Sequence, residues 1–184
     1  MNREQLAHIL RAAARVTDDP EIVVIGSQAI LGTWDDDELP EEATLSVEAD
    51  VAFRVDPDEA KADAVDGAIG ELSAFHETFG YYGQGVVVKT ATLPEGWEDR
   101  VVAFDRADAD PASGVCVEAH DLVISKLVAG REKDRSFATA LIHAELLDVT
   151  LLLERAGQIP MPEAVKERVR DQVRHCARQK PPKS

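Results

Sequence analysis

Two carboxylates on one predicted strand are the residues best placed for chemistry. Glu48 and Asp50 stand two positions apart in residues 45–55, where apolar and polar side chains alternate. Alternate residues of a strand point to the same face, so the two carboxylates are expected side by side. They repel each other unless cations lie between them, and carboxylate oxygens suit Mg²⁺ or Mn²⁺. The spacing therefore suits a metal site that also holds a nucleoside triphosphate; the plainer alternative is a solvent-facing polar strand.

A glycine–serine pair comes before this strand. Residues 22–25 are all β-branched and apolar, which predicts a buried strand that ends at Gly26 and Ser27, followed by a short helix. Glycine allows a ligand to approach the backbone, and a serine hydroxyl together with the free N–H groups of a helix turn can hold a phosphate. The same pair is also typical of a plain turn.

Charged residues in the C-terminal third form a further candidate group. Lys126 lies among apolar neighbours in a predicted helix, and Arg131, Lys133 and Asp134 surround the break before the next helix. These residues could contact phosphates or balance the charge of Glu48. The alternative is ordinary helix-end electrostatics, with bases near one helix C-terminus and an acid at the next N-terminus.

The remaining elements follow from apolar periodicity. Further strands are predicted over residues 86–93, 100–104 and 115–117, with a turn at 80–85. Helices are predicted over residues 2–16, 58–75, 119–129, 134–156 and 162–179. We therefore expect an α+β fold: a small mixed sheet flanked by helices and followed by a helical C-terminal third. As one compact unit, an α/β core over 1–118 would carry a helical region over 119–184, with a basic tail from about residue 166.

Composition limits the class of protein. The chain has 184 residues, 45% hydrophobic and 30% charged, which is ordinary for one globular domain. No apolar run reaches the roughly 18 residues of a membrane helix, and residues 1–5 precede no apolar signal core, so we expect a cytoplasmic protein without membrane contact. Cys116 and Cys176 lie in no metal-binding motif and are expected to be free thiols.

The charge of the chain is uneven. The formal net charge is −15, and residues 35–66 hold thirteen acids against two bases. Residues 166–183 hold seven bases against two acids, and this segment is the one feature that favours an RNA partner. The overall negative charge disfavours one. A solvated acidic face and a basic tail without a partner are the simpler interpretation.

In their order along the chain, these motifs resemble the nucleotidyltransferase superfamily that includes DNA polymerase β-like enzymes. The chain is most similar to uncharacterised bacterial nucleotidyltransferases allied to the toxins of AbiE-like abortive-infection systems and to related tRNA-targeting toxins. The likeness covers roughly residues 20–150, and three segments carry it: residues 79–86, 93–100 and 120–134.

The resemblance implies a nucleotidyltransferase dependent on Mg²⁺ (or Mn²⁺). It would move a nucleoside monophosphate from a nucleoside triphosphate to an RNA, such as tRNA, or to a protein. Glu48 and Asp50 match the catalytic metal carboxylates, and Lys126 matches a catalytic lysine that contacts phosphates. The nucleotide-binding positions it implies are Gly26, Ser27, Ser46, Arg131, Lys133 and Asp134. A role as the toxin of a toxin–antitoxin system, with a cognate antitoxin as partner, would also follow.

The chain departs from that pattern in three places. Glu48 stands where aspartate is commoner, and the gap from Ser27 to Glu48 is longer than usual because of an acidic insert around residues 35–42. The predicted strand that includes residues 86–92 supplies no third carboxylate. These departures leave two alternatives to an active enzyme: a catalytically degenerate nucleotide-binding regulator, or a protein-interaction module of the same fold.

Overall fold

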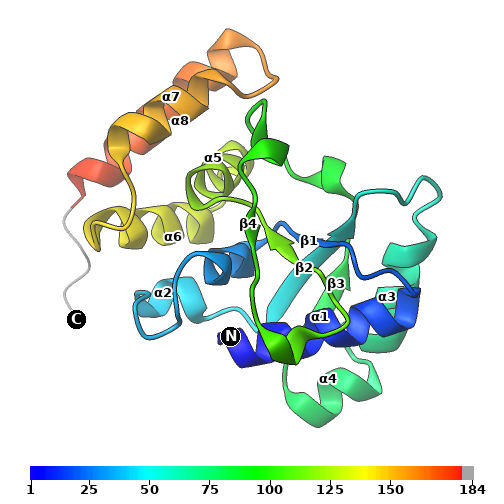
Figure 1. Ribbon diagram of the computed structural model, residues 1–184. Helices are drawn as coiled ribbons and strands as arrows, with labels where there is room; N and C mark the ends of the chain where they lie inside the picture. The colour runs from blue at the N-terminus through cyan, green and yellow to red at the C-terminus, as the bar shows by residue number, and fades with distance from the viewer. Residues whose placement is uncertain (180–184) are drawn as a thin grey trace.

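A five-stranded mixed sheet forms the centre of the computed structural model, which describes residues 1–179 (Figure 1). The strands are, in sheet order, β3 (Tyr82–Gly85), β2 (Glu48–Phe53), β1 (Ile22–Val24), β5 (Val115–Cys116) and β4 (Val102–Ala103). β2 is antiparallel to β1 and parallel to β3, while β5 is parallel to β1 and antiparallel to β4. The strand that bears both predicted carboxylates is thus hydrogen-bonded on both sides.

Three N-terminal helices lie against one face of this sheet: α1 (Arg3–Thr17), α3 (Ala60–Ile69) and α4 (Ala74–Phe79). α1 begins at a capping box, in which Asn2 and Gln5 each accept the other's backbone N–H. Side chains of α1 and α3 meet over β3, where Ile9 and Ile69 lie close to Gly83. This face is filled by apolar packing and leaves the opposite face of β2 for polar groups.

The opposite face meets short segments and the C-terminal helices. The short segments are η1 (Ser27–Gly32), α2 (Glu41–Thr44), η2 (Val88–Thr90) and η3 (Trp97–Asp99), whereas η4 (Ala107–Ala109) packs against α1. The C-terminal helices are α5 (Ala119–Ala129), α6 (Glu132–His143), α7 (Val149–Gly157) and α8 (Glu163–Arg178). One apolar cluster runs from Leu10 of α1 through Val24 to Leu141 and Val173, so the helical region shares its core with the sheet.

The fold class, the first strands and α5 agree with the sequence prediction, but the strand predicted over residues 86–93 is wrong. β3 lies earlier, where a turn was predicted, and Val88–Thr90 form a 3₁₀ helix. The glycines that suggested a turn are instead close approaches. A Cβ on Gly85 would stand 2.0 Å from the carbonyl oxygen of Ala62, and one on Gly83 would stand 2.9 Å from Ile9.

Two predicted helices are each divided in two. The helix predicted over 58–75 breaks at residues 70–73, and the one over 134–156 breaks at residues 144–148. At the second break Glu145 has a φ of 59°, and the Asp148 carboxylate accepts the N–H groups of Thr150 and Leu151 to begin α7. The helix over 119–129 has its predicted bounds and ends at Gly130 with a φ of 70°.

The structure also describes the two cysteines and the apolar character of the helices. Cys116 and Cys176 are buried free thiols, as predicted. Among residues 1–179 there is no helix with the length and apolar character needed to cross a membrane.

Candidate active site

Gly26 and Asp50 form the centre of the candidate site. The pairing of β1 with β2 continues through a hydrogen bond from the Ile25 N–H to the Asp50 carbonyl (3.1 Å), which places Gly26 beside the Asp50 side chain. A Cβ on Gly26 would stand 1.5 Å from Asp50 Oδ2. The φ of Gly26 is −87°, which any residue adopts, so the glycine is required for space alone. The Asp50 carboxylate occupies the volume that a side chain would fill.

Lys126 reaches this site from α5. Its Nζ donates to Ser27 Oγ at 2.8 Å and lies 3.5 Å from Asp134 Oδ1. It also lies 4.8 Å from the centre of the Phe137 ring. Burial lowers the pKa of Lys126, and the carboxylates of Asp134 and Asp50 oppose that shift. The sequence folds this way because Gly130 turns the chain between α5 and α6 and so brings positions 126 and 134 together.

Asp134 also caps α6. Its carboxylate accepts the backbone N–H of Arg131 at 3.3 Å and is almost fully buried. Asp134 therefore both caps α6 and pairs with the Lys126 ammonium, which fixes Lys126 relative to the start of α6.

Hydrogen bonds fix both the side chain and the backbone of Glu48, the other carboxylate of the pair. The Tyr82 hydroxyl donates to Glu48 Oε2 at 2.6 Å. Burial and the Glu48 carboxylate raise the pKa of Tyr82 well above its ordinary value, so the hydroxyl keeps its proton at neutral pH. Ser46 accepts the Glu48 N–H at 3.2 Å, and the buried Gln28 amide donates to the Ser46 carbonyl. Ser46 thus fixes the first residue of β2.

The predicted residues largely converge on one cleft of about 330 Å³. Its lining includes Gly26, Glu48, Asp50, Lys126, Arg131 and Asp134. Ser27 contributes through its bond to Lys126 rather than as lining, and Ser46 and Lys133 do not line the cleft. Lys133 is exposed, although its charge lowers the pKa of Asp50.

Several lining residues were missed by sequence reasoning. Thr90 and Ser125 bring hydroxyl groups, and Val86, Ala91 and Ala129 form an apolar side of the cleft. Tyr82 was missed because residues 80–85 were predicted to be a turn. Of these residues, only Ser125 could have been found from the sequence, because it stands next to Lys126 in the chain.

The two carboxylates share an unfavourable electrostatic environment. Burial, and then the negative charge of Glu48, raises the pKa of Asp50 to about 6, while Lys126 and Lys133 pull it down. In the unfolded chain the group titrates near 3.8, so between these values the native protein binds more protons. Native stability contributed by Asp50 therefore falls as the pH rises from about 4 to about 6 and stays low above that.

We expect Asp50→Asn to make the protein more stable at neutral and alkaline pH. The amide has no charge to bury, so the free energy of unfolding should rise by about 2 kcal/mol at about pH 8 and by much less near pH 4.5. Urea unfolding of both proteins at the two pH values measures this. If the two proteins have equal free energies of unfolding at the higher pH, the surroundings of Asp50 do not disfavour its charged form.

These features fit a hard divalent cation. The donors are carboxylate oxygens, and a bound cation would oppose the repulsion from Glu48 that, after burial, raises the pKa of Asp50. Within residues 1–179 no three His, Cys, Asp or Glu side chains gather in a way that could hold a metal ion. The protein would therefore supply two acidic residues, Glu48 and Asp50, and the other oxygen ligands would come from phosphate and water.

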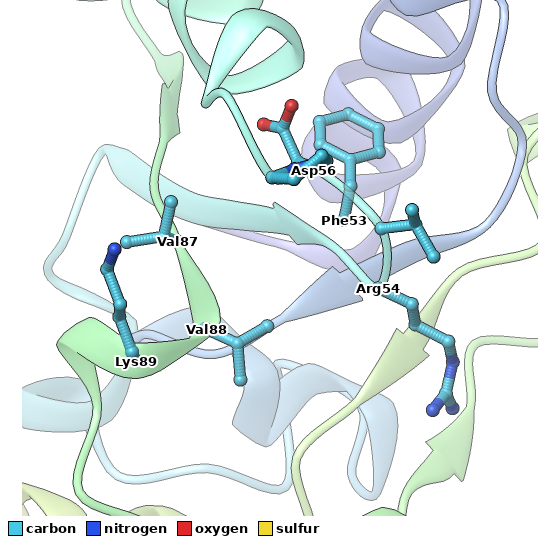
Figure 2. A pocket seen from close by; sticks show the side chains of 8 residues that line it. Phe53, Arg54, Asp56, Val87, Val88 and Lys89 are labelled. Atoms are coloured by element: carbon cyan, nitrogen blue, oxygen red, sulfur yellow. The ribbon is translucent and has the colours of Figure 1, made fainter.

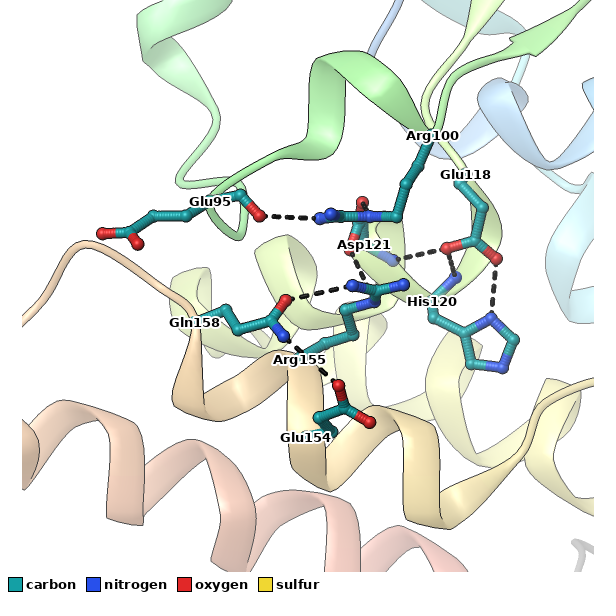
Figure 3. A network of polar contacts seen from close by, with 8 residues as sticks. All are labelled: Glu95, Arg100, Glu118, His120, Asp121, Glu154, Arg155 and Gln158. Carbon is teal, nitrogen blue, oxygen red and sulfur yellow. Dashed lines mark hydrogen bonds and ion pairs between the residues drawn. The ribbon is translucent and has the colours of Figure 1, made fainter.

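A buried ion network fixes the helix that carries Lys126. Figure 3 shows Asp121 of α5 between Arg100 and Arg155, at 2.8 Å and 3.5 Å from their Nε atoms. Asp121 is fully buried, and burial raises its pKa while the two arginines oppose the shift. Arg155 also donates to Gln158 at 3.0 Å. The network joins α5 to the segment before β4 and to α7.

A second cleft lies where β2 and β3 separate (Figure 2). Phe53, Val87 and Val88 give it apolar walls, and Asp56 is its acidic residue. The Asp56 carboxylate already accepts the N–H groups of Lys61 and Ala62 and so begins α3. This cleft has no second carboxylate among its lining residues, and we assign the chemistry to the first cleft.

Comparison with known proteins identifies a family for the chain. A family model described as "Nucleotidyltransferase of unknown function (DUF6036)" matches residues 4–180. No curated protein matches the chain, and no solved structure matches it.

Proposed function

Because the chain belongs to this family of nucleotidyltransferases of unknown function (DUF6036), we propose that it moves a nucleoside monophosphate from a nucleoside triphosphate to an acceptor hydroxyl. The observation that carries the proposal is the contact between Gly26 and Asp50. A strand end without a side chain leaves room for the half-buried Asp50 carboxylate, and Glu48 and Lys126 line the same cleft.

In this reaction some residues of the cleft would bind the metal ion and others the phosphates. Glu48 and Asp50 would hold Mg²⁺ or Mn²⁺, which when bound neutralises charge on the phosphates. Lys126 and Arg131 would bind phosphate oxygens, and Ser27 holds the Lys126 ammonium in place. The acceptor oxygen bonds to the α-phosphorus as the bond to the β-phosphate oxygen breaks. Pyrophosphate leaves, and the hydroxyl proton passes to water.

An RNA or a protein could supply the acceptor hydroxyl. The basic segment that favours RNA is partly neutralised: Arg170 contacts Glu163 and Glu167, and Arg174 contacts Glu167 and Asp171. Lys180 and Lys183 lie outside the described residues. We keep both acceptors in the proposal. The resemblance of residues 79–86, 93–100 and 120–134 to nucleotidyltransferases allied to abortive-infection toxins supports a toxin role with a cognate antitoxin.

A transfer assay tests this function. We expect wild-type protein with Mg²⁺ or Mn²⁺ and one of four α-labelled triphosphates to label either a tRNA-sized band in total RNA or a protein band. Asp50→Asn should reduce the label by about 100-fold or more, because one metal carboxylate is lost. Equal labelling by the two proteins would refute the assignment of Asp50.

One observation favours a second candidate, a regulator that binds nucleotide without transfer. Among residues 1–179 no third acidic side chain joins Glu48 and Asp50 in a group that could hold a metal ion, because Asp134, which also lines the cleft, faces the Arg131 N–H and Lys126. In that case triphosphate with Mg²⁺ would raise the melting temperature of the wild-type protein while no label is transferred. The same samples therefore separate the two functions.

A further inference from the structure

Tyr82 stands directly across from Glu48. β2 and β3 are parallel, and their register pairs Glu48 with Tyr82 and Asp50 with Gln84. The neighbouring strand thus presents a phenol to Glu48, while the Gln84 amide donates to Asp66 instead. The Tyr82 side chain is buried, and its ring lies 4.6 Å from the ring of His76 in α4.

Glu48 needs a partner of this kind. A glutamate has one more rotatable bond than an aspartate, so fixing its side chain costs more conformational entropy. The Tyr82 hydroxyl donates to Glu48 Oε2 at 2.6 Å, and this bond joins the carboxylate to the neighbouring strand.

We infer that Tyr82 is a positioning residue for the metal-binding carboxylate of Glu48, an inference that rests on the proposed function. The phenol holds Glu48 Oε2 through one hydrogen bond, donated from the strand that lies beside β2. Hydrogen-bond partners of metal ligands commonly contribute 10- to 100-fold to metal affinity. Cation affinity of this site should therefore depend on a hydroxyl that touches neither cation nor nucleotide.

The test replaces one hydroxyl and keeps the ring. Mn²⁺ binding is measured by electron paramagnetic resonance, with a non-hydrolysable triphosphate present and no turnover. We expect Tyr82→Phe to weaken Mn²⁺ binding by about 10-fold. Transfer by this variant should be low at limiting Mn²⁺ and close to wild type at saturating Mn²⁺, because the hydroxyl orients a ligand and does not react.

The adjacent tyrosine is a matched control. Tyr81 points to the other side of β3, where its hydroxyl bonds His8 Nδ1 at 2.8 Å. Tyr81→Phe loses an equivalent hydrogen bond and should keep wild-type Mn²⁺ affinity. In a Glu48→Gln background, Tyr82→Phe should cause no further loss, since its effect acts through the carboxylate. This cycle also detects a general loss of packing, which would weaken binding in both backgrounds.

The outcomes separate the two hypotheses. If wild type binds Mn²⁺, Asp50→Asn does not, and Tyr82→Phe binds like wild type, then the role of Tyr82 is wrong and the proposed function stands. A loss of equal size in both Glu48 backgrounds also refutes the role of Tyr82. If wild type binds no Mn²⁺ with nucleotide present, the metal site itself is refuted, and the inference about Tyr82 is refuted with it.

Discussion

Gly26→Ala should reduce nucleotide transfer and Mn²⁺ binding by about 100-fold or more while the protein stays folded. The new Cβ would stand 1.5 Å from Asp50 Oδ2, so the carboxylate must rotate away from the cleft. A displacement of about 1 Å is enough to cost roughly 100-fold in rate at a catalytic site. Transfer kinetics and Mn²⁺ titration measure the effect, and circular dichroism checks the fold.

The chain offers a matched glycine for comparison. Gly67 lies inside α3, and a Cβ there would meet nothing within 4 Å. Gly67→Ala should leave transfer unchanged and raise the free energy of unfolding by up to about 1 kcal/mol, because alanine favours a helix. If Gly26→Ala keeps wild-type transfer, the volume beside Asp50 has no part in the activity.

Lys126→Met should lower transfer by about 100-fold and also destabilise the protein. Methionine fills similar space but removes the ammonium that bonds Ser27 and lies beside Asp134. Asp134, almost fully buried, then keeps the Arg131 N–H as a partner but loses its cation. Removing one member of a buried ion pair costs about 3 kcal/mol. Urea unfolding and transfer kinetics measure the two effects.

A second substitution separates the two roles of this lysine. In Lys126→Met/Asp134→Asn the orphaned charge is gone, so most of the stability should return while transfer stays low. Mn²⁺ binding should change little in either variant, because Glu48 and Asp50 are intact. Transfer that recovers together with stability would show that Lys126 only balances Asp134 and has no contact with the nucleotide.

Much of the candidate site was predictable because its residues lie on short local patterns. A β-branched run that ends at Gly26, alternation around Asp50 and a lysine among apolar neighbours each place one group, and the structure brings these groups to one cleft. Their metal and nucleotide roles stay predictions. Ser46 could not be placed this way, because its hydroxyl bonds the backbone of β2.

The missed elements depend on contacts far apart in the chain. β3 holds Gly83 and Gly85 because Ile9, Ile69 and the Ala62 backbone come too close for side chains, and local sequence shows only two glycines. The break between α6 and α7 has a local sign in Asp148, but the apolar pattern of the two helices runs on through it. The contact of Tyr82 with Glu48 depends on the position of β3, which the local sequence does not show.

The strand order also indicates when each half of the cleft forms during folding. β1, β2 and β3 all lie within residues 22–85, so the acidic half assembles from nearby stretches of chain. Lys126 meets Ser27 across 99 positions, and α5 follows the pairing of β5 with β1. Contacts between residues far apart in the sequence close a longer loop. We therefore expect the contact of Lys126 with Ser27 to form last during folding. A chain emerging from the ribosome would thus hold its paired carboxylates before the cation that balances them, and could bind nucleotide only after α5 had been synthesised.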